Sequence, residues 1–107
     1  MQPTPDQYIL VIGTHPEIMD TLHRLIQKME GFSCVCALTL KDALARASEH
    51  AFDMVLLSSG LDEVTEAHIR TGMQRLLPGV PVVQHYGGGS GLLYNEIAQT
   101  LHHQPKP

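Results

Sequence analysis

The sequence has few basic residues, and they do not gather into a cluster. Seven Lys and Arg stand against eleven Asp and Glu, which gives a formal net charge of −4. The basic residues are spread singly along the chain: Arg24, Lys28, Lys41, Arg46, Arg70, Arg75 and Lys106. Proteins that bind DNA or RNA directly neutralise phosphates with a basic patch or stripe. We therefore expect no nucleic-acid partner.

Long hydrophobic runs are also missing. A membrane-spanning helix needs about 20 consecutive apolar residues, and every apolar run in this chain is much shorter. Residues 1–7 lack the basic start and the apolar stretch of a secretory signal peptide. The sequence therefore predicts no membrane association and a reduced, cytoplasmic location, in keeping with its low cysteine content.

The two cysteines, Cys34 and Cys36, alternate within a strand-like stretch, so their side chains share one face. Thiols in such places are usually buried as small hydrophobic groups. A Cys-x-Cys metal or redox site is the sharper alternative, but no second Cys or His pair lies near it in the sequence. We therefore predict no metal and no cofactor.

The length of 107 residues and the 43% hydrophobic content fit one folded domain. We predict a single domain over residues 1–107, with flexible tails at 1–7 and 103–107. Apolar, β-branched strands alternate along it with amphipathic helices. The strands are predicted at 8–12, 32–38, 52–57 and 80–85, and helices lie between them and after the last. This order predicts right-handed crossovers and a parallel sheet.

Capping residues mark the predicted helix starts. Thr14 and Glu17 form a capping box around Pro16, and Thr39 with Asp42 begins the second helix. Gly31 is predicted to end the first helix, and Ser90 can cap the last. The inner face of the first helix is predicted from its apolar spacing to hold Ile18, Leu22, Leu25, Ile26 and Met29.

Three stretches resemble a response-regulator receiver domain of the CheY type. They are 9–12 leading into a helix, 52–57 with its Phe-Asp-hydrophobic start, and 78–83 with prolines before hydrophobic strand residues. The similarity spans residues 8–86. It implies a flavodoxin-like, three-layer α/β/α fold with a parallel four-stranded sheet of order 2-1-3-4. The last helix follows the fourth strand through a glycine run, so one strand and one helix of a receiver are missing.

The resemblance also locates the phosphorylation chemistry of a receiver. That chemistry needs an acidic pair for Mg²⁺ after the first strand, an aspartate after the third, a hydroxyl after the fourth and a lysine after the fifth. In this sequence the acidic pair falls at Gly13 and Thr14. The aspartate position falls at Ser58, the hydroxyl position falls near Tyr86, and the lysine has no counterpart. We therefore expect a pseudo-receiver, not an enzyme, that acts in signalling through a protein partner.

Two carboxylates, Asp62 and Glu63, lie just downstream of the third strand. Either could return an acidic group to the rim of the sheet. Using them as the phospho-acceptor would shift the alignment so far that the strand register breaks. We therefore do not assign the acceptor to them.

The same edge of the sheet suggests a small-ligand or anion site instead, because ligands of open parallel sheets bind outside the carboxyl ends of the strands. His15, Ser59 and His85 are expected there beside a glycine-rich run. The run consists of Gly87, Gly88, Gly89, Ser90 and Gly91. Its backbone N–H groups could bind an anion at a helix N-terminus, or the run could simply replace the missing strand and helix. Both interpretations stay open.

The histidines allow two interpretations as well. His15 and His85 could form a metal-binding or proton-transfer pair, because imidazole titrates near neutral pH. A single histidine at a helix start or strand end is more often a hydrogen-bonded structural group. The remaining histidines are predicted at solvated helix or tail positions: His23, His50, His68, His102 and His103.

A weaker resemblance connects the chain with cobalamin-binding domains, which share this topology. His15 and residues 59–61 and 88–89 stand at separations similar to that family's motifs. However, Gly13 and Ile18 occupy the aspartate and glycine positions of its first motif. Part of the spacing follows from the shared fold alone.

A missing fifth strand would leave the fourth strand at the edge of the sheet. Val82 and Val83 would then form an apolar edge, and such edges are usually covered or paired. We predict homodimerisation or partner docking at this edge.

Overall fold

The computed structural model describes residues 7–58, 60–85 and 90–102. Strands and helices alternate throughout. They are β1 (Gln7–Ile12), α1 (Pro16–Gln27), β2 (Phe32–Ala37), α2 (Leu40–Glu49), β3 (Met54–Leu57), α3 (Glu63–Leu76), β4 (Val82–Gln84) and α4 (Ser90–His102). The sheet has the order β2-β1-β3-β4, and each neighbouring pair is parallel. The predicted strand order is therefore confirmed.

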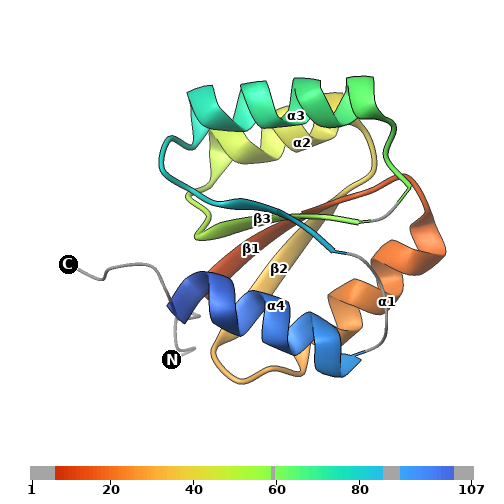
Figure 1. The fold of residues 1–107 in the computed structure, drawn as a ribbon, viewed down its shortest axis with the longest axis vertical. Helices are drawn as coiled ribbons and strands as arrows, with labels where there is room; N and C mark the ends of the chain where they lie inside the picture. The colour runs from red at the N-terminus through yellow and green to blue at the C-terminus, as the bar shows by residue number, and fades with distance from the viewer. Residues whose placement is uncertain (1–6, 59, 86–89, 103–107) are drawn as a thin grey trace.

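Three layers are visible in Figure 1, with α1 and α4 on one face of the sheet and α2 and α3 on the other. The two central strands are buried on both faces because their side chains alternate between the two helix layers. Ile9 and Val11 pack toward α1 and α4. Leu10 and Ile12 pack toward α2 and α3. The three-layer α/β/α prediction is confirmed.

The start of α1 differs from the prediction. His15 is the N-cap residue, makes no side-chain capping bond, and is followed by Pro16 at the first helical position. Glu17 is thus the second helical residue, whereas a capping box needs it at the third. The predicted capping box is wrong. By contrast, the Thr39 side chain accepts a hydrogen bond from the Asp42 N–H at 3.0 Å, as predicted for α2.

The inner face of α1 is also shifted. Met19 is buried, whereas Ile18 is 40% exposed, so the prediction that Ile18 belongs to the core is wrong. The helix ends at Gln27, and Gly31 lies in the following turn with φ of 87°. That left-handed conformation suits glycine, which explains its position without placing it at the helix end.

The Phe-Asp pair before β3 has a structural role. Phe52 is buried among the side chains that α2 and α3 cover. The Asp53 carboxylate accepts a hydrogen bond from the Tyr8 N–H at 2.8 Å, and the Asp53 N–H donates to the Tyr8 carbonyl at 2.7 Å. These bonds connect the starts of β1 and β3 and fix their register.

β4 lies at an edge of the sheet, as predicted, but it is short and partly covered. Val82 and Val83 are both half-buried, and they pack against opposite faces of the core. In the part of the chain that the structure describes, no helix has the length and apolar character needed to cross a membrane.

Candidate functional site

The carboxyl ends of β1 and β3 meet where a receiver would carry its acidic groups. The Ser58 N–H donates to the Ile12 carbonyl at 2.9 Å, so Ser58 lies directly beside the end of β1. Its side chain is fully buried. A Cβ added at Gly13 would lie 2.1 Å from Ser58 Oγ and 2.7 Å from Met19 Sδ. The structure therefore brings the two predicted positions together, but it fills the space between them.

His15 is exposed at the rim of this edge. A Cβ added at Gly60 would lie 3.3 Å from its Nε2 atom, so the ring lies over the turn that follows β3. Gly60 has φ of 98°, a conformation that favours glycine. Thr14, the residue before His15, is also exposed.

His85 follows β4 and is buried at 6% exposure. Its Nδ1 atom pairs with a carboxylate oxygen of Glu96 on α4, whose side chain is 15% exposed. The sequence reasoning missed this partner because Glu96 is reached only through the packing of α4. The two histidines proposed as a pair thus have different neighbours: His15 lies against Gly60, and His85 contacts Glu96.

Several predicted site residues lie outside the described residues, namely Ser59, Tyr86, Gly87, Gly88 and Gly89. Ser90 and Gly91 belong to the first turn of α4. The ligand-binding interpretation of the glycine run, and the resemblance to cobalamin-binding domains that uses part of it, therefore remain predictions.

The downstream acidic residue Asp62 has a local function. Its carboxylate accepts a hydrogen bond from the Thr65 N–H at 2.6 Å and caps the start of α3. The bond to Thr65 lowers the pKa of the Asp62 carboxyl group, because it stabilises the charged form. Asp62 therefore serves the helix terminus.

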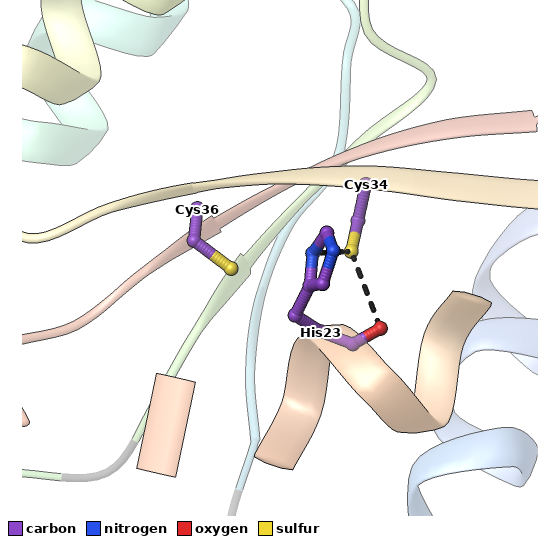
Figure 2. Close-up of side chains that lie close together, drawn as sticks. All are labelled: His23, Cys34 and Cys36. Carbon is purple, nitrogen blue, oxygen red and sulfur yellow. Dashed lines mark hydrogen bonds between the residues drawn. The ribbon is translucent and has the colours of Figure 1, made fainter. Parts of the chain in front are cut away.

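A second group of reactive side chains lies on β2, the edge strand on the far side of the sheet from β4, and on the neighbouring helix α1. Figure 2 shows the His23 ring beside Cys34, with Cys36 on the same side of β2. The Nδ1 atom of His23 is 3.3 Å from Cys34 Sγ. The ligand atoms of His23, Cys34 and Cys36 all lie within 4.8 Å of one another. The prediction that His23 is solvated is wrong, because it is half-buried against β2.

The helix places these groups through two residues that are one turn apart. Gln27 of α1 accepts a hydrogen bond from the Cys34 N–H at 3.0 Å through its Oε1 atom. His23 lies four residues earlier, on the same helix face. Gln27 therefore fixes α1 against the outer edge of β2, and the register of that contact brings His23 to the Cys34 thiol. The sequence analysis did not identify His23 as a neighbour of the cysteine pair, because it lies 11 residues before Cys34.

The two thiols differ in acidity. A hydrogen bond from Cys34, together with the nearby His23, lowers the pKa of Cys36 to about 7, although burial opposes the change. The same pairing and burial raise the pKa of Cys34 above its ordinary range. Both cysteines are free. Of the two thiols, Cys36 is therefore the one whose pKa is lowered.

A groove of about 490 Å³ opens over this cluster. Its lining comes from α1, β2 and α2, and it includes Asp20, His23, Cys34, Cys36, Asp42 and Arg46. The outer edge of β2 forms its floor, so the cluster is accessible from solvent.

Comparisons with known proteins place the fold. No protein-family model matches the sequence, and no curated protein does. Solved structures do match. The receiver domain of the hybrid histidine kinase CckA has a TM-score of 0.77 at 18% identity, over 88% of this chain and 98% of its own. The Vibrio cholerae chemotaxis protein CheY4 has a TM-score of 0.76 at 14% identity, over 89% and 98%.

A CheY-like receiver domain from Methanospirillum hungatei JF-1 gives a TM-score of 0.75 at 18% identity, over 90% of this chain and 94% of its own. All three share with this chain the parallel sheet and its helix layers, at low sequence identity. The four-stranded sheet of the described residues is shorter than that of a full receiver. The chain has the flavodoxin-like fold of CheY-type response-regulator receiver domains, in a shortened form.

Proposed function

We propose that this chain is a non-catalytic signalling module of the receiver type that binds a protein partner and takes no phosphoryl group. The observation that carries this proposal is the close packing of Gly13 against Ser58. An acidic side chain at position 13 would need space that Ser58 Oγ and Met19 Sδ already fill. An ionised carboxylate would also be costly in such a buried place.

The hydroxyl at the acceptor position gives further support. Ser58 is fully buried, so its oxygen cannot reach a phosphoryl donor unless the edge opens. The carboxylates described on neighbouring elements have other roles: Asp62 caps α3 and Glu96 pairs with His85. A magnesium site needs several oxygen ligands around one point. The described carboxylates do not converge on Ser58.

Incubation with acetyl phosphate and Mg²⁺ tests this proposal, with a phosphorylatable receiver treated in parallel. Intact mass spectrometry should show no increase of about 80 Da, the mass of one phosphoryl group. A stable adduct located on Ser58 or Asp62 would overturn the proposal. The parallel receiver shows that the reagent and the timing were adequate.

The free edge of β4 supports the protein-binding part of the proposal. Pro81 and His85 bond to β3 through their backbone groups, so the backbone groups of Val82 and Gln84 face away from the sheet. The Arg70 Nη1 atom donates to the Val82 carbonyl at 3.1 Å and covers part of this edge. We assign the docking surface to this edge and take a second copy of the chain as the first partner to test.

Light scattering across micromolar concentrations is the direct measurement. We expect a mass above that of the monomer, and Val82→Pro should return it to the monomer because proline removes the outward-facing N–H. Arg75→Ala, in the last turn of the neighbouring α3, is the matched surface control and should leave the mass unchanged. A wild-type monomer at every concentration would contradict self-association.

A further inference from the structure

The cluster of His23, Cys34 and Cys36 has the composition and geometry of a metal site. One imidazole nitrogen and two thiol sulfurs come from a helix and an edge strand, and the groove leaves them accessible. Nothing in the proposed receiver function requires this combination. Cys34 is buried, whereas His23 and Cys36 are half-buried, so the groove reaches the cluster from the side of these two residues.

The distances match those between ligands that share one small cation. In a tetrahedral zinc site with bonds of about 2.3 Å to sulfur and about 2.0 Å to nitrogen, neighbouring N and S ligands lie about 3.5 Å apart and two sulfurs about 3.8 Å apart. The His23 Nδ1 to Cys34 Sγ distance is 3.3 Å. The remaining pairs lie within 4.8 Å, so side-chain shifts of about an ångström complete the geometry.

We propose that His23, Cys34 and Cys36 bind one Zn²⁺ ion at the β2 edge, with its fourth coordination position facing the groove. Two thiolates and an imidazole are a ligand set typical of zinc. Asp20 lines the same groove, one helical turn before His23, and can supply the fourth ligand directly or through a water molecule. The groove therefore provides both the soft ligands and a place for the exchangeable one.

Metal binding would replace the thiol protons of Cys34 and Cys36. The Cys34 thiol now lies 3.9 Å from the His23 carbonyl oxygen, and the Cys36 thiol lies 3.7 Å from that of Met19. These are weak contacts to α1. Zinc binding holds both sulfurs as thiolates and releases to solvent the protons that the thiols still carry, as metal binding to cysteine requires. The zinc charge compensates the thiolates beside those carbonyl oxygens.

The site would join α1 to the edge strand. Met19, one turn before His23 on α1, also lies against Gly13. Gly13 is at the carboxyl ends of β1 and β3, where a receiver carries its acidic groups; we call this place the receiver edge. Metal bound at β2 would therefore fix the helix whose Met19 side chain packs against the end of β1. Zinc would regulate the helix position through direct coordination.

The test uses Co²⁺ as a spectroscopic probe and Zn²⁺ as its competitor, in the full chain kept reduced by a reductant without thiols. We expect one Co²⁺ per chain, with the absorption of tetrahedral thiolate-bound cobalt, and displacement by one Zn²⁺. Proton release, measured with an indicator dye near pH 7, should lie between one and two per metal. Cys36→Ser and His23→Gln should each weaken the affinity at least tenfold.

Two control variants separate this site from other histidines. His68→Ala removes an exposed histidine on α3, and His102→Ala with His103→Ala removes the pair near the C-terminus of the sequence. Both variants should bind Co²⁺ as the wild type does. Because Cys34 is buried, its replacement can unfold the chain, so the assay uses Cys36→Ser and verifies its fold by circular dichroism.

Several results would overturn the proposal. They are an absent cobalt–thiolate absorption, an unchanged affinity in Cys36→Ser, or a loss of binding confined to the His102/His103 variant. Binding of Cu(I) without Co²⁺ or Zn²⁺ would overturn the zinc assignment. Rapid formation of a Cys34–Cys36 disulfide in air, with no metal binding in the reduced chain, would identify a redox pair in its place.

Discussion

Two places in the fold differ in how closely they are packed. One is the receiver edge, where β1 and β3 end, and the other is the outer edge of β2. At the first, Gly13 lies so close to Ser58 that a single added carbon would be 2.1 Å from its Oγ atom. At the second, an imidazole and two thiols are among the groups that line a groove of about 490 Å³. The groove along the edge strand therefore has room for a ligand.

The polar groups at the two places differ as well. Near the receiver edge, His85 pairs with Glu96, and the Asp62 carboxylate caps the start of α3. At β2, Cys34 Sγ lies 3.3 Å from His23 Nδ1, and the two thiols contact helix carbonyls at 3.7 and 3.9 Å. Groups with strong partners hold structure, whereas weakly bonded groups can exchange their protons for a ligand. The following predictions test that contrast.

The largest effect is expected from Gly13→Asp, which restores an acidic residue to the receiver edge. Its Cβ would collide with Ser58 and Met19, and its carboxylate would be buried. Overpacking together with an unpaired buried charge should cost about 3 kcal/mol or more of the free energy of unfolding. Urea unfolding followed by circular dichroism measures this, and a failure to fold is the extreme form of the same result.

Gly13→Ala isolates the steric part and should cost about 1–3 kcal/mol. Gly72→Ala in α3 is its matched control, since a Cβ added there meets only the flexible end of the Leu44 side chain of α2, at 2.5 Å. That change should be close to neutral, because alanine favours the helix by about 1 kcal/mol over glycine. Equal stability of Gly13→Ala and wild type would show that the edge is not closed.

Glu96→Ala should have the next largest effect. It leaves His85 buried without its carboxylate partner, and an unsatisfied buried polar group costs about 1–3 kcal/mol. Glu66→Ala removes the exposed pair with Arg70 and should cost below about 1 kcal/mol, as surface pairs do. The two urea unfolding midpoints compare them. A smaller loss for Glu96→Ala than for Glu66→Ala would contradict the structural role of the His85 pair.

The fold could be predicted from sequence because its signal is local. The apolar runs of β1 and β3 are buried on both faces, and Thr39 caps its helix as its sequence indicates. The start of α1 was mispredicted because two cues competed. The Thr14–Glu17 pattern and Pro16 at the first helical position cannot both define the same helix start, and the proline position is the one observed.

The candidate sites were less accessible to sequence reasoning because they depend on contacts between distant residues. His23 and Cys34 are brought together by the register that Gln27 sets between α1 and β2. Glu96 reaches His85 only through the position of α4. The two residues of each pair are 11 positions apart, so a search for partners at short sequence separation finds neither the His23–Cys34 contact nor the His85–Glu96 contact. Helix-face spacing from Gln27 to His23 was the available signal.

Thiol reactivity should separate Cys36 from Cys34 in the metal-free chain. Because the pKa of Cys36 is lowered to about 7, its alkylation rate should rise with pH and reach half its maximum near that value. Cys34, buried and with a raised pKa, should react at least tenfold more slowly until the chain is unfolded. Timed iodoacetamide labelling with peptide mass spectrometry measures both rates. Equal rates in the folded chain would contradict the difference in environment.

The smallest effect concerns Asp62, the carboxylate that lies nearest in sequence to the acceptor position and caps α3. Its folded-state pKa is lowered from 3.8, so its contribution to stability is present above that value and is lost as the pH falls through the lower folded pKa. The stability difference between wild type and Asp62→Ala should therefore be constant near pH 6 and shrink at about pH 3. Thr39→Ala removes a cap that does not titrate, and its difference from wild type should not narrow in this way. Urea midpoints of the three proteins across this range measure the contrast. A gap for Asp62→Ala that stayed constant with pH would mean that its carboxylate does not stabilise α3, and Asp62 would again be available as an acidic group at the receiver edge.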